Sequence, residues 1–347
     1  MPDLIVTNFN RNFTGVSATA AGVVGVQAGR HDLVLVGQPL PGCPAPVRKR
    51  DALALSRRPP PGRPFTIWHV RRNPEMRCAL FARDMLRLPV RIVFTSAAQR
   101  RHSALPRWLI SRMDAVIATT EKAADFVPHV RGVVPHGVDT ARFSPAPDRA
   151  AAWRATGFAG ARGIATIGRI RPEKGTDRFV EAMLRLLPGH PDVTALVIGR
   201  AARGDRGFLD GLKARVAKAG LSDRILFPGE VAARDLPGLM RALSAVVQLP
   251  RYEGYGMAPL EAMASGVPFL ATDTGYYRRF ADGGRAGIIL PGDDAPACAA
   301  ALDTLLGSPG RHGEMARDAR QTAETRFSIT AEADGIGAVY EALWREG

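Results

Sequence analysis

The stretch YEGYGMAPLEAMASGVPFLAT, residues 252–272, carries two glutamates eight positions apart, one in a glycine-rich turn and one on the helix that follows. Glu253 lies in the turn. Glu261 lies on the helix, where Pro259 occupies an early position at which a missing N–H costs little. The glycines of the turn let backbone N–H groups approach a ligand closely, and a helix N-terminus favours an anion. This stretch therefore predicts a site that holds sugar hydroxyls beside a phosphate.

A second charged loop lies upstream, in the run GRIRPEKG (168–175). Arg169 and Lys174 follow an apolar strand and precede a helix expected to begin near Thr176. Ligands of open α/β sheets bind outside the carboxyl ends of the strands. Two cations and a helix N-terminus at that edge would neutralise a diphosphate and stabilise it as a leaving group. A solvated basic turn is the alternative, and the downstream glutamates favour the binding site.

Short apolar runs alternate with helical stretches along the chain, which predicts parallel strands joined by crossover helices. The runs expected as strands are DLIVTNF, HDLVLVG, FTIWHV, VRIVFTS and DAVIATT in the first half, and GIATIGRI, VTALVIGR, RILFPGEV, SAVVQLP, VPFLATD and AGIILPG in the second. Helices are expected near 14–29, 75–87, 176–187, 207–219, 235–243, 259–265, 295–306, 311–325 and 329–345. The proline- and arginine-rich span 39–64 lacks periodicity and is expected to be a mobile surface loop. Two doubly wound domains with a hinge between Pro135 and Pro147 fit this series.

The glutamate stretch resembles the E-x7-E motif of retaining glycosyltransferases of family 4, which have the GT-B fold. Four further stretches resemble segments of that family in order and spacing: NRNFTGVSATAAGV (10–23), VVPHGVDTARFSP (133–145), ATIGRIRPEKGTDRFVEAM (165–183) and RILFPGEV (224–231). The resemblance implies an α/β fold of two Rossmann-like domains facing a central cleft. It implies an acceptor-binding domain at 1–145, a nucleotide-sugar-binding domain at 146–326, and a helix at 327–347 that packs back on the first domain.

The resemblance also implies roles for individual residues. Arg169 and Lys174 would hold the donor diphosphate, and with Glu253, which would contact the donor sugar, they form the expected catalytic set. Glu261 would bind the ribose hydroxyls. The other expected donor-binding residues are Gly15 in a loop that closes over the donor, Gly168, Val231 beside the base, and Gly254, Tyr255, Gly256 and Met257.

The mechanism implied is transfer on one face of the sugar, in which the leaving diphosphate helps to deprotonate the acceptor. A double displacement would need a carboxylate nucleophile beside the anomeric carbon, and the resemblance does not assign Glu253 that role. Many family members have a histidine after the strand that here ends IVFTSAA, and Ala97 occupies that place. No metal or other cofactor is expected.

At a finer level, the TGVSAT loop and the stretches WHVRRNPEM (68–76) and FTSAAQRRH (94–102) look like those of lipopolysaccharide core mannosyltransferases. This similarity implies transfer of mannose from GDP-mannose to a Kdo sugar on a lipid A precursor. Another donor such as UDP-glucose, or another glycolipid acceptor, is the alternative.

Positive charge is concentrated in the N-terminal half of the chain. The formal charge is +14, of which residues 1–145 contribute +12. Such asymmetry favours a polyanionic partner, whereas an arginine-rich proteome would raise the charge of both halves. The candidate acceptor-binding residues are Arg71, Arg72, Arg100 and Arg101, because arginine makes bidentate contacts with carboxylate and phosphate. His136 is a further candidate, because Gly137 after it suits a tight turn near a ligand, and a structural hinge histidine is the equal alternative. His69 and His102 are expected to be packed or surface histidines.

The segment MRCALFARDMLRL (76–88) mixes apolar side chains with arginines, and Arg107 and Trp108 follow nearby. A plain amphipathic core helix is the favoured interpretation, and docking on an anionic membrane surface is the alternative. The sequence shows no long apolar run, no signal-peptide pattern and no metal or disulfide pattern in its three cysteines. We therefore expect a cytoplasmic protein that is peripheral on the inner face of the inner membrane.

Two other classes of protein are disfavoured. A Rossmann oxidoreductase predicts G-x-G-x-x-G after the first strand, and the sequence has none. A nucleic-acid-binding protein predicts a recognisable binding motif beyond net charge, and none is visible.

Overall fold

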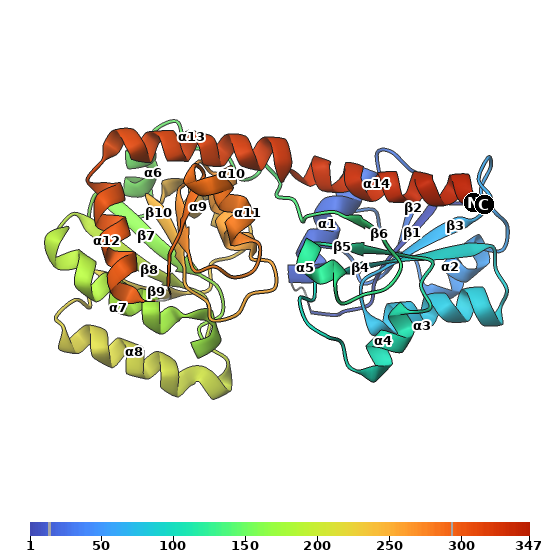
Figure 1. Ribbon diagram of the computed structural model, residues 1–347, viewed down its shortest axis with the longest axis horizontal. Coiled ribbons are helices and arrows are strands. Elements are labelled where there is room, and N and C mark those ends of the chain that lie inside the picture. Colours follow the sequence, from blue (N-terminus) through green and yellow to red (C-terminus); the bar gives the residue numbers. More distant parts are fainter. Residues whose placement is uncertain (13–14, 293) are drawn as a thin grey trace. The chain divides into compact units, whose positions relative to one another are not determined.

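A computed structural model of the chain describes residues 1–12, 15–292 and 294–347. It divides into two compact units, Met1–Gly137 with Phe327–Gly347, and Val138–Arg326 (Figure 1). Each unit contains one six-stranded sheet, and neighbouring strands pair in parallel throughout the described residues. The expected α/β fold class is confirmed. The first unit ends at Gly137 rather than at 145, and the central cleft stays a prediction.

The sheet of the first unit has the strand order β2-β1-β3-β4-β5-β6. Its strands are β1 Leu4–Asn8, β2 Leu33–Gly37, β3 Thr66–Val70, β4 Val90–Ser96, β5 Ala115–Ala118 and β6 Val130–Val133. Strands β1, β3 and β5 are buried throughout, because helices cover both faces of the sheet. The edge strand β6 was not predicted, since its burial alternates and its sequence VRGV is short.

The helices of the first unit cover its sheet from two sides. They are α1 Gly15–Gln27, α2 Lys49–Leu55, α3 Asn73–Leu80, α4 Ala104–Ile110, α5 Glu121–Ala124 and α14 Ile329–Glu346, with a π-helix, η1, at Phe81–Met85. One core cluster joins α1 and α14 to the sheet and includes Ile336, Tyr340 and Trp344. The other joins α3 and α4 to the opposite face. The C-terminal helix therefore belongs to the core of the first unit.

The expectation of a mobile loop over 39–64 is wrong in its middle. Residues Lys49–Leu55 form helix α2, and Ala52 is completely buried. The run KRDALAL consists mostly of good helix formers, and its three-residue apolar face is too short to show as a period. Trp68 Nε1 donates to Ser56 Oγ at 3.0 Å and anchors the end of the helix.

The sheet of the second unit has the order β12-β11-β10-β7-β8-β9. Its strands are β7 Arg162–Ile167, β8 Val193–Ile198, β9 Ile225–Gly229, β10 Ala245–Gln248, β11 Phe269–Ala271 and β12 Gly287–Ile289. Its α-helices are α6 Arg149–Ala155, α7 Thr176–Leu186, α8 Arg206–Lys218, α9 Leu236–Ala242, α10 Met257–Ala264, α11 Tyr277–Ala281, α12 Ala295–Leu306 and α13 Pro309–Arg326. All six predicted strands of this half are present. The short helices α6 and α11 were not predicted.

Each sheet has a point at which the strand order reverses. This switch point lies between β1 and β3 in the first unit and between β7 and β10 in the second. In the second unit the order is that of a Rossmann sheet, in which ligands bind outside the carboxyl ends of the strands at the switch point. Among the described residues, no helix has the length and apolarity needed to cross a bilayer.

Candidate active site

The loops that follow β7 and β10 meet at the switch point of the second unit. Lys174 Nζ, in the loop after β7, lies 2.5 Å from Glu253 Oε2, in the loop after β10. The other carboxylate oxygen of Glu253 accepts from the backbone N–H of Gly254 at 3.0 Å. Both side chains are only partly exposed, at 24% for Lys174 and 19% for Glu253. Two residues predicted to act on the donor, 79 positions apart, are thus brought together as an ion pair.

Glycine allows these loops to touch. Gly175 has φ +67°, and a Cβ there would lie 1.7 Å from the backbone oxygen of Leu249. The same holds between the loops after β7 and β8, because a Cβ at Gly199 would lie 1.8 Å from the oxygen of Gly168. No side chain larger than hydrogen fits at either place without moving backbone. Glycine is therefore required at positions 175 and 199 because the neighbouring loop passes so close.

Tyr277 holds Glu253 in place and was not predicted from the sequence. It is buried, its hydroxyl hydrogen-bonds Glu253, and burial raises its pKa well above the usual range, with the carboxylate adding to the effect. Its ring occupies the space that a Cβ at Gly256 would need, at 2.1 Å. The run TGYY after a predicted strand was the available signal. Tyr277 thus holds Glu253 and explains why position 256 is glycine.

The two basic residues of the loop after β7 differ in surroundings. Arg169 is exposed, whereas Lys174 is held by Glu253. Gly168, Arg169 and Lys174 line one small hollow at the carboxyl ends of β7 and β8. Its position beside the start of α7 suits an anion.

A larger cavity of about 520 Å³ lies next to it, at the carboxyl ends of β8 and β9. Apolar atoms of Ile170 and Phe227 line it. Its basic residues are Arg200, Arg203, Arg206 and Lys213. A cavity of this size and mixed lining fits a small organic group such as a nucleobase. Val231 lies two residues beyond β9 and is partly buried, but it is not among the residues that line this cavity.

Glu261 lies on the second turn of α10, which begins at Met257. Burial raises the pKa of its carboxyl group to about 7, and Arg142 opposes this shift. A carboxyl group held near neutrality at a candidate site is typical of a ligand-binding position. The structure therefore places the second glutamate of the motif where its charge is costly without a partner, while its role towards ribose stays a prediction.

The remaining donor-binding candidates take the following places. Tyr255 is buried and stacks on Tyr276, so its side chain packs the turn and leaves only its backbone for a ligand. Gly254 and Met257 are partly buried in the same turn. Gly15 begins α1 in the first unit, and open space surrounds its Cβ position. Its neighbours 13 and 14 lie outside the described residues, so loop closure stays a prediction.

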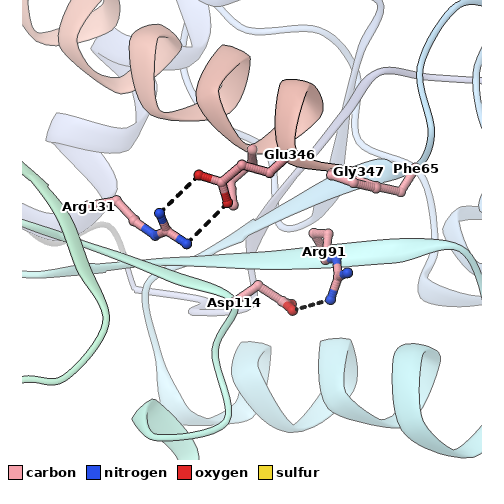
Figure 2. A pocket seen from close by; sticks show the side chains of 7 residues that line it. Phe65, Arg91, Asp114, Arg131, Glu346 and Gly347 are labelled. Carbon is pink, nitrogen blue, oxygen red and sulfur yellow. Dashed lines mark hydrogen bonds and ion pairs between the residues drawn. The ribbon is translucent and has the colours of Figure 1, made fainter.

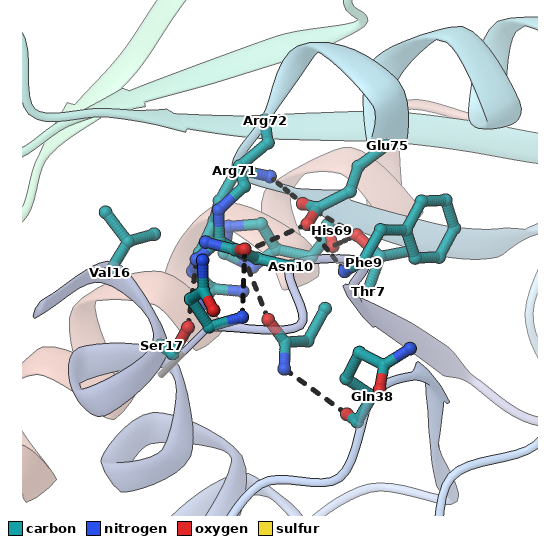
Figure 3. Close-up of polar contacts among 12 residues, drawn as sticks. Thr7, Phe9, Asn10, Val16, Ser17, Gln38, His69, Arg71, Arg72 and Glu75 are labelled. Carbon is teal, nitrogen blue, oxygen red and sulfur yellow. Dashed lines mark hydrogen bonds and ion pairs between the residues drawn. The ribbon is translucent and has the colours of Figure 1, made fainter. Parts of the chain in front are cut away.

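A polar network occupies the switch point of the first unit, and Figure 3 shows it. Its centre is Glu75, which is completely buried. Its carboxylate accepts from the Thr7 hydroxyl at 3.1 Å and from the backbone N–H groups of Phe9 at 3.1 Å and Arg71 at 2.8 Å. It also accepts from Arg72 Nη1 at 3.2 Å. This glutamate was missed because a single acidic residue in an arginine-rich run carries no sequence signal.

Arg72, a predicted acceptor-binding residue, is engaged by the protein itself. Its guanidinium donates to Asn8 Oδ1 at 3.1 Å and to Ser17 Oγ at 3.0 Å, besides Glu75. These bonds tie the ends of β1 and β3 to the first turn of α1. An acceptor role for Arg72 would have to use the same guanidinium and stays a prediction.

Arg71 differs from Arg72. Its Nη1 is buried and has no hydrogen-bond partner among the described residues, and burial lowers the pKa of this guanidinium. On the same face of the sheet, His69 Nε2 lies 2.7 Å from Thr95 Oγ1, and its Nδ1 contacts the Tyr340 hydroxyl. Burial holds the pKa of His69 well below the usual range, so the ring is neutral. Of the two arginines, Arg71 is the one with donor capacity to spare.

The other acceptor candidates are dispersed. His136 Nδ1 lies 2.8 Å from Glu332 Oε1, and Gly137 N donates to Glu332 Oε2 at 2.7 Å, so this histidine fastens the first turn of α14. Arg100 and Arg101 are exposed in the segment between β4 and α4. Ala97 directly follows β4. His102 has a pKa lowered by burial and by Arg100.

One further cavity, of about 210 Å³, lies at the amino ends of the strands of the first sheet, opposite to its switch-point loops (Figure 2). Arg131 pairs with Glu346 at 2.9 and 3.1 Å, and Arg91 pairs with Asp114 at 2.9 Å. Asp114 directly precedes β5, which places the cavity at the amino ends of the strands. Ligands of such sheets bind at the carboxyl ends, so we assign these ion pairs a structural role: Arg131 fastens α14, and Arg91–Asp114 ties β4 to the start of β5.

Comparisons with known proteins agree with this geometry. The family model "Glycosyl transferases group 1" matches residues 155–326, which contain all of the loops just described for the second unit. The lipopolysaccharide core biosynthesis mannosyltransferase LpsB of Rhizobium meliloti (strain 1021) is 43% identical to the chain, covering 99% of it and 98% of that protein. LpcC of Rhizobium leguminosarum bv. viciae, with the same description, is 41% identical, over 99% of the chain and 98% of that protein.

The chain belongs to the group 1 glycosyltransferases. Anabaena Alr3699/HepE in complex with UDP has a solved structure that matches with a TM-score of 0.82 at 16% identity, over 98% of this chain and 100% of that one. At this identity the likeness shows the fold, which is GT-B as the motifs implied. This glycosyltransferase therefore carries its Lys174–Glu253 pair in the domain that the family model covers.

Proposed function

We propose that this glycosyltransferase transfers mannose from GDP-mannose to a lipopolysaccharide core acceptor, a Kdo sugar on a lipid A precursor, with retention of configuration. The observation that carries the proposal is the Lys174–Glu253 pair at the switch point, in which Lys174 also lines the hollow beside α7 and Glu253 precedes the helix of Glu261. The names of its relatives LpsB and LpcC support the sugar and the acceptor class.

In this proposal, Arg169 and Lys174 bind the diphosphate and stabilise the charge that develops as it leaves. Glu253, fixed by Lys174 and Tyr277, accepts from hydroxyls of the donor sugar. Glu261 accepts from the ribose hydroxyls. The bond from the anomeric carbon to the diphosphate breaks, the acceptor oxygen bonds to that carbon on the same face, and the hydroxyl proton passes to the diphosphate oxygen. The base occupies the 520 Å³ cavity.

The donor is tested by thermal unfolding with GDP-mannose, UDP-glucose, ADP-glucose and NAD. A ligand at about a hundred times its Kd adds roughly 2.7 kcal/mol to the stability. Stabilisation by GDP-mannose alone, lost in Lys174→Ala and Glu261→Ala and kept in Arg215→Ala, supports the proposal. Arg215 is the control because it forms an exposed ion pair with Glu181 on the same unit. Stabilisation by UDP-glucose instead contradicts the mannose assignment.

Acceptor and mechanism need a transfer assay. Kdo-lipid A and GDP-mannose should give a product with the donor's α configuration by NMR, and transfer should persist in EDTA because no metal is proposed. An inverted product contradicts retention. The acceptor implies that the enzyme works at the cytoplasmic face of the inner membrane.

A further inference from the structure

Large apolar side chains are exposed on two neighbouring elements of the first unit. Phe81, Met85 and Leu86 lie on or directly after the π-helix η1, with 49%, 71% and 44% of their surface exposed. Leu105 and Trp108 lie on α4, each 57% exposed. We call these five side chains the apolar face. Soluble proteins seldom expose so many large apolar groups together without a partner for them.

The two elements form one surface. Helices α3 and α4 lie side by side on the same face of the sheet (Figure 1). At the end of η1, Arg83 Nη2 donates to the backbone oxygen of Arg112 at 2.9 Å. Asp84 lies 4.0 Å from the Arg112 guanidinium, one turn beyond Trp108. The residue before Met85 is therefore tied to the turn after Trp108, so the two elements that carry the apolar face are neighbours.

The backbone presents the apolar groups outward. Leu86 N donates to Phe81 O at 3.1 Å, which is the i→i+5 bond of a π turn, and Arg87 follows with φ +53°. A π turn adds a residue to the helix and shifts the side chains after it around the axis. As a result, Met85 and Leu86 point away from the core, whereas Ala82 remains completely buried.

Arginines surround this face. Residues 76–112 contain eight arginines, one acidic residue and no lysine. The acidic residue, Asp84, is paired with Arg83, and Asp114 is paired with Arg83 and Arg91. The exposed arginines are Arg77, Arg87, Arg91, Arg100, Arg101, Arg107 and Arg112, of which Arg91 is paired with Asp114. The combination of apolar groups with an arginine rim is typical of surfaces that enter the headgroup region of anionic bilayers.

We propose that the apolar face docks on an anionic lipid bilayer, with Trp108 and Met85 in the acyl boundary and the arginines on the headgroups. A second copy of the chain is a poorer occupant, because a two-fold contact would oppose two arginine rims of the same charge. A nucleic acid would use the arginines and leave the apolar groups in water. This inference specifies the membrane contact that the proposed lipid-linked acceptor requires, but its test uses neither donor nor acceptor.

The chain contains its own probe for this contact. Of its four tryptophans, Trp68, Trp153 and Trp344 are 0%, 1% and 5% exposed, so a lipid-dependent change in emission comes from Trp108. Vesicles of phosphatidylglycerol and phosphatidylcholine should shift the emission of the full chain to the blue, and brominated acyl chains should quench it. Pure phosphatidylcholine should do neither, and 1 M salt, at a Debye length of about 3 Å, should weaken binding. Trp108→Phe should remove the signal while the protein still sediments with the vesicles.

Variants then separate the apolar and charged parts. The double variant Met85→Ser, Leu105→Ser keeps the probe and should lower the partition coefficient about a hundredfold, since each side chain buried in the bilayer contributes about one decade or more. Val133→Ser is the matched control, being exposed by 39% on β6. Arg77→Ser with Arg107→Ser should also weaken binding, whereas Arg57→Ser with Arg58→Ser, both exposed after α2, should not.

Three outcomes overturn the proposal. Trp108 emission that ignores anionic vesicles means that the face does not enter a bilayer. Binding that survives both sets of patch variants means that another surface makes the contact. Blue-shifted emission without lipid, together with a dimer that Met85→Ser, Leu105→Ser converts to a monomer in sedimentation, assigns the face to a second copy. Each result is obtained whether or not mannose is transferred.

Discussion

At the switch point of the second unit, glycines let loops touch and bring Lys174 to Glu253 beside the exposed Arg169. At the switch point of the first unit, the same edge is filled by the protein's own hydrogen bonds around buried Glu75, to which Arg72 is committed. One edge thus presents charge to a ligand, and the other uses charge to order its own strand ends. Two sheets of different strand order therefore present, at their switch points, a site open to an anion in one unit and a hydrogen-bond network centred on Glu75 in the other.

The largest effect that tests this contrast is on catalysis. Lys174→Ala should lower the transfer rate by about 10²–10³-fold, because it removes a positioned cation from the developing diphosphate charge and releases Glu253. Steady-state kinetics with the donor identified by the binding assay measure the loss. Arg215→Ala should retain full activity. A Lys174 variant with an unchanged kcat/KM would show that the ion pair is structural. Charge at the switch point of the second unit would then only order the protein itself, as it does in the first unit.

A matched pair of glycine variants tests whether glycine is required for the loops of the second unit to touch. Gly175 and Gly220 both have φ +67°, but only Gly175 would direct a Cβ into backbone, at 1.7 Å, while Gly220 has open space. Gly175→Ala should cost roughly 3 kcal/mol or more in unfolding free energy, and Gly220→Ala about 1 kcal/mol for the left-handed conformation alone. Urea unfolding measures both. Equal losses would mean that strain, rather than loop contact, requires glycine at 175.

The claim that the first network is structural is tested at its centre. Glu75→Gln replaces one carboxylate acceptor by an amide that cannot accept from all of its donors, and should lower the unfolding free energy by about 2–3 kcal/mol. Glu181→Gln, on an exposed ion pair of α7, should change it by less than about 1 kcal/mol. Chemical denaturation compares the two. Should Glu75→Gln keep wild-type stability, the network would be free to serve a ligand.

The smallest effect concerns pH and Glu261. Its folded pKa of about 7 lies above the usual value of 4.5, so the native state retains a proton that the unfolded state loses between these values. Stability therefore falls as pH rises from about 4.5 to about 7 and is level beyond. Glu261→Gln should remove this pH dependence. The unfolding free energy of the variant minus that of wild type should therefore be about 1–3 kcal/mol higher at pH 8 than at pH 4. Denaturation at both pH values measures it. If the unfolding free energies of the two proteins change with pH in parallel, the Glu261 carboxyl group is solvated and its pKa is not raised.

Much of the fold could be predicted from the local pattern of apolar and turn residues in the sequence. All the strands of the second unit and five of the six in the first were predicted, since buried parallel strands appear as apolar runs bounded by turn residues. The helices α2, α4, α5, α6 and α11 were not predicted, because a helix of four to seven residues shows too few turns for a period. Apart from α9, the α-helices of seven residues or fewer were therefore known only from the structure.

The candidate site divides in the same way. By itself, the sequence determined which loops are glycine-rich and charged, and so named Arg169, Lys174, Glu253 and Glu261. Only the tertiary structure decided that Lys174 meets Glu253, that Tyr277 holds that glutamate, and that Arg72 pairs with Glu75. The physical reason is that glycine and apolar spacing act on neighbouring residues, whereas a charge finds its partner only when strands far apart in the chain end at one edge of a sheet.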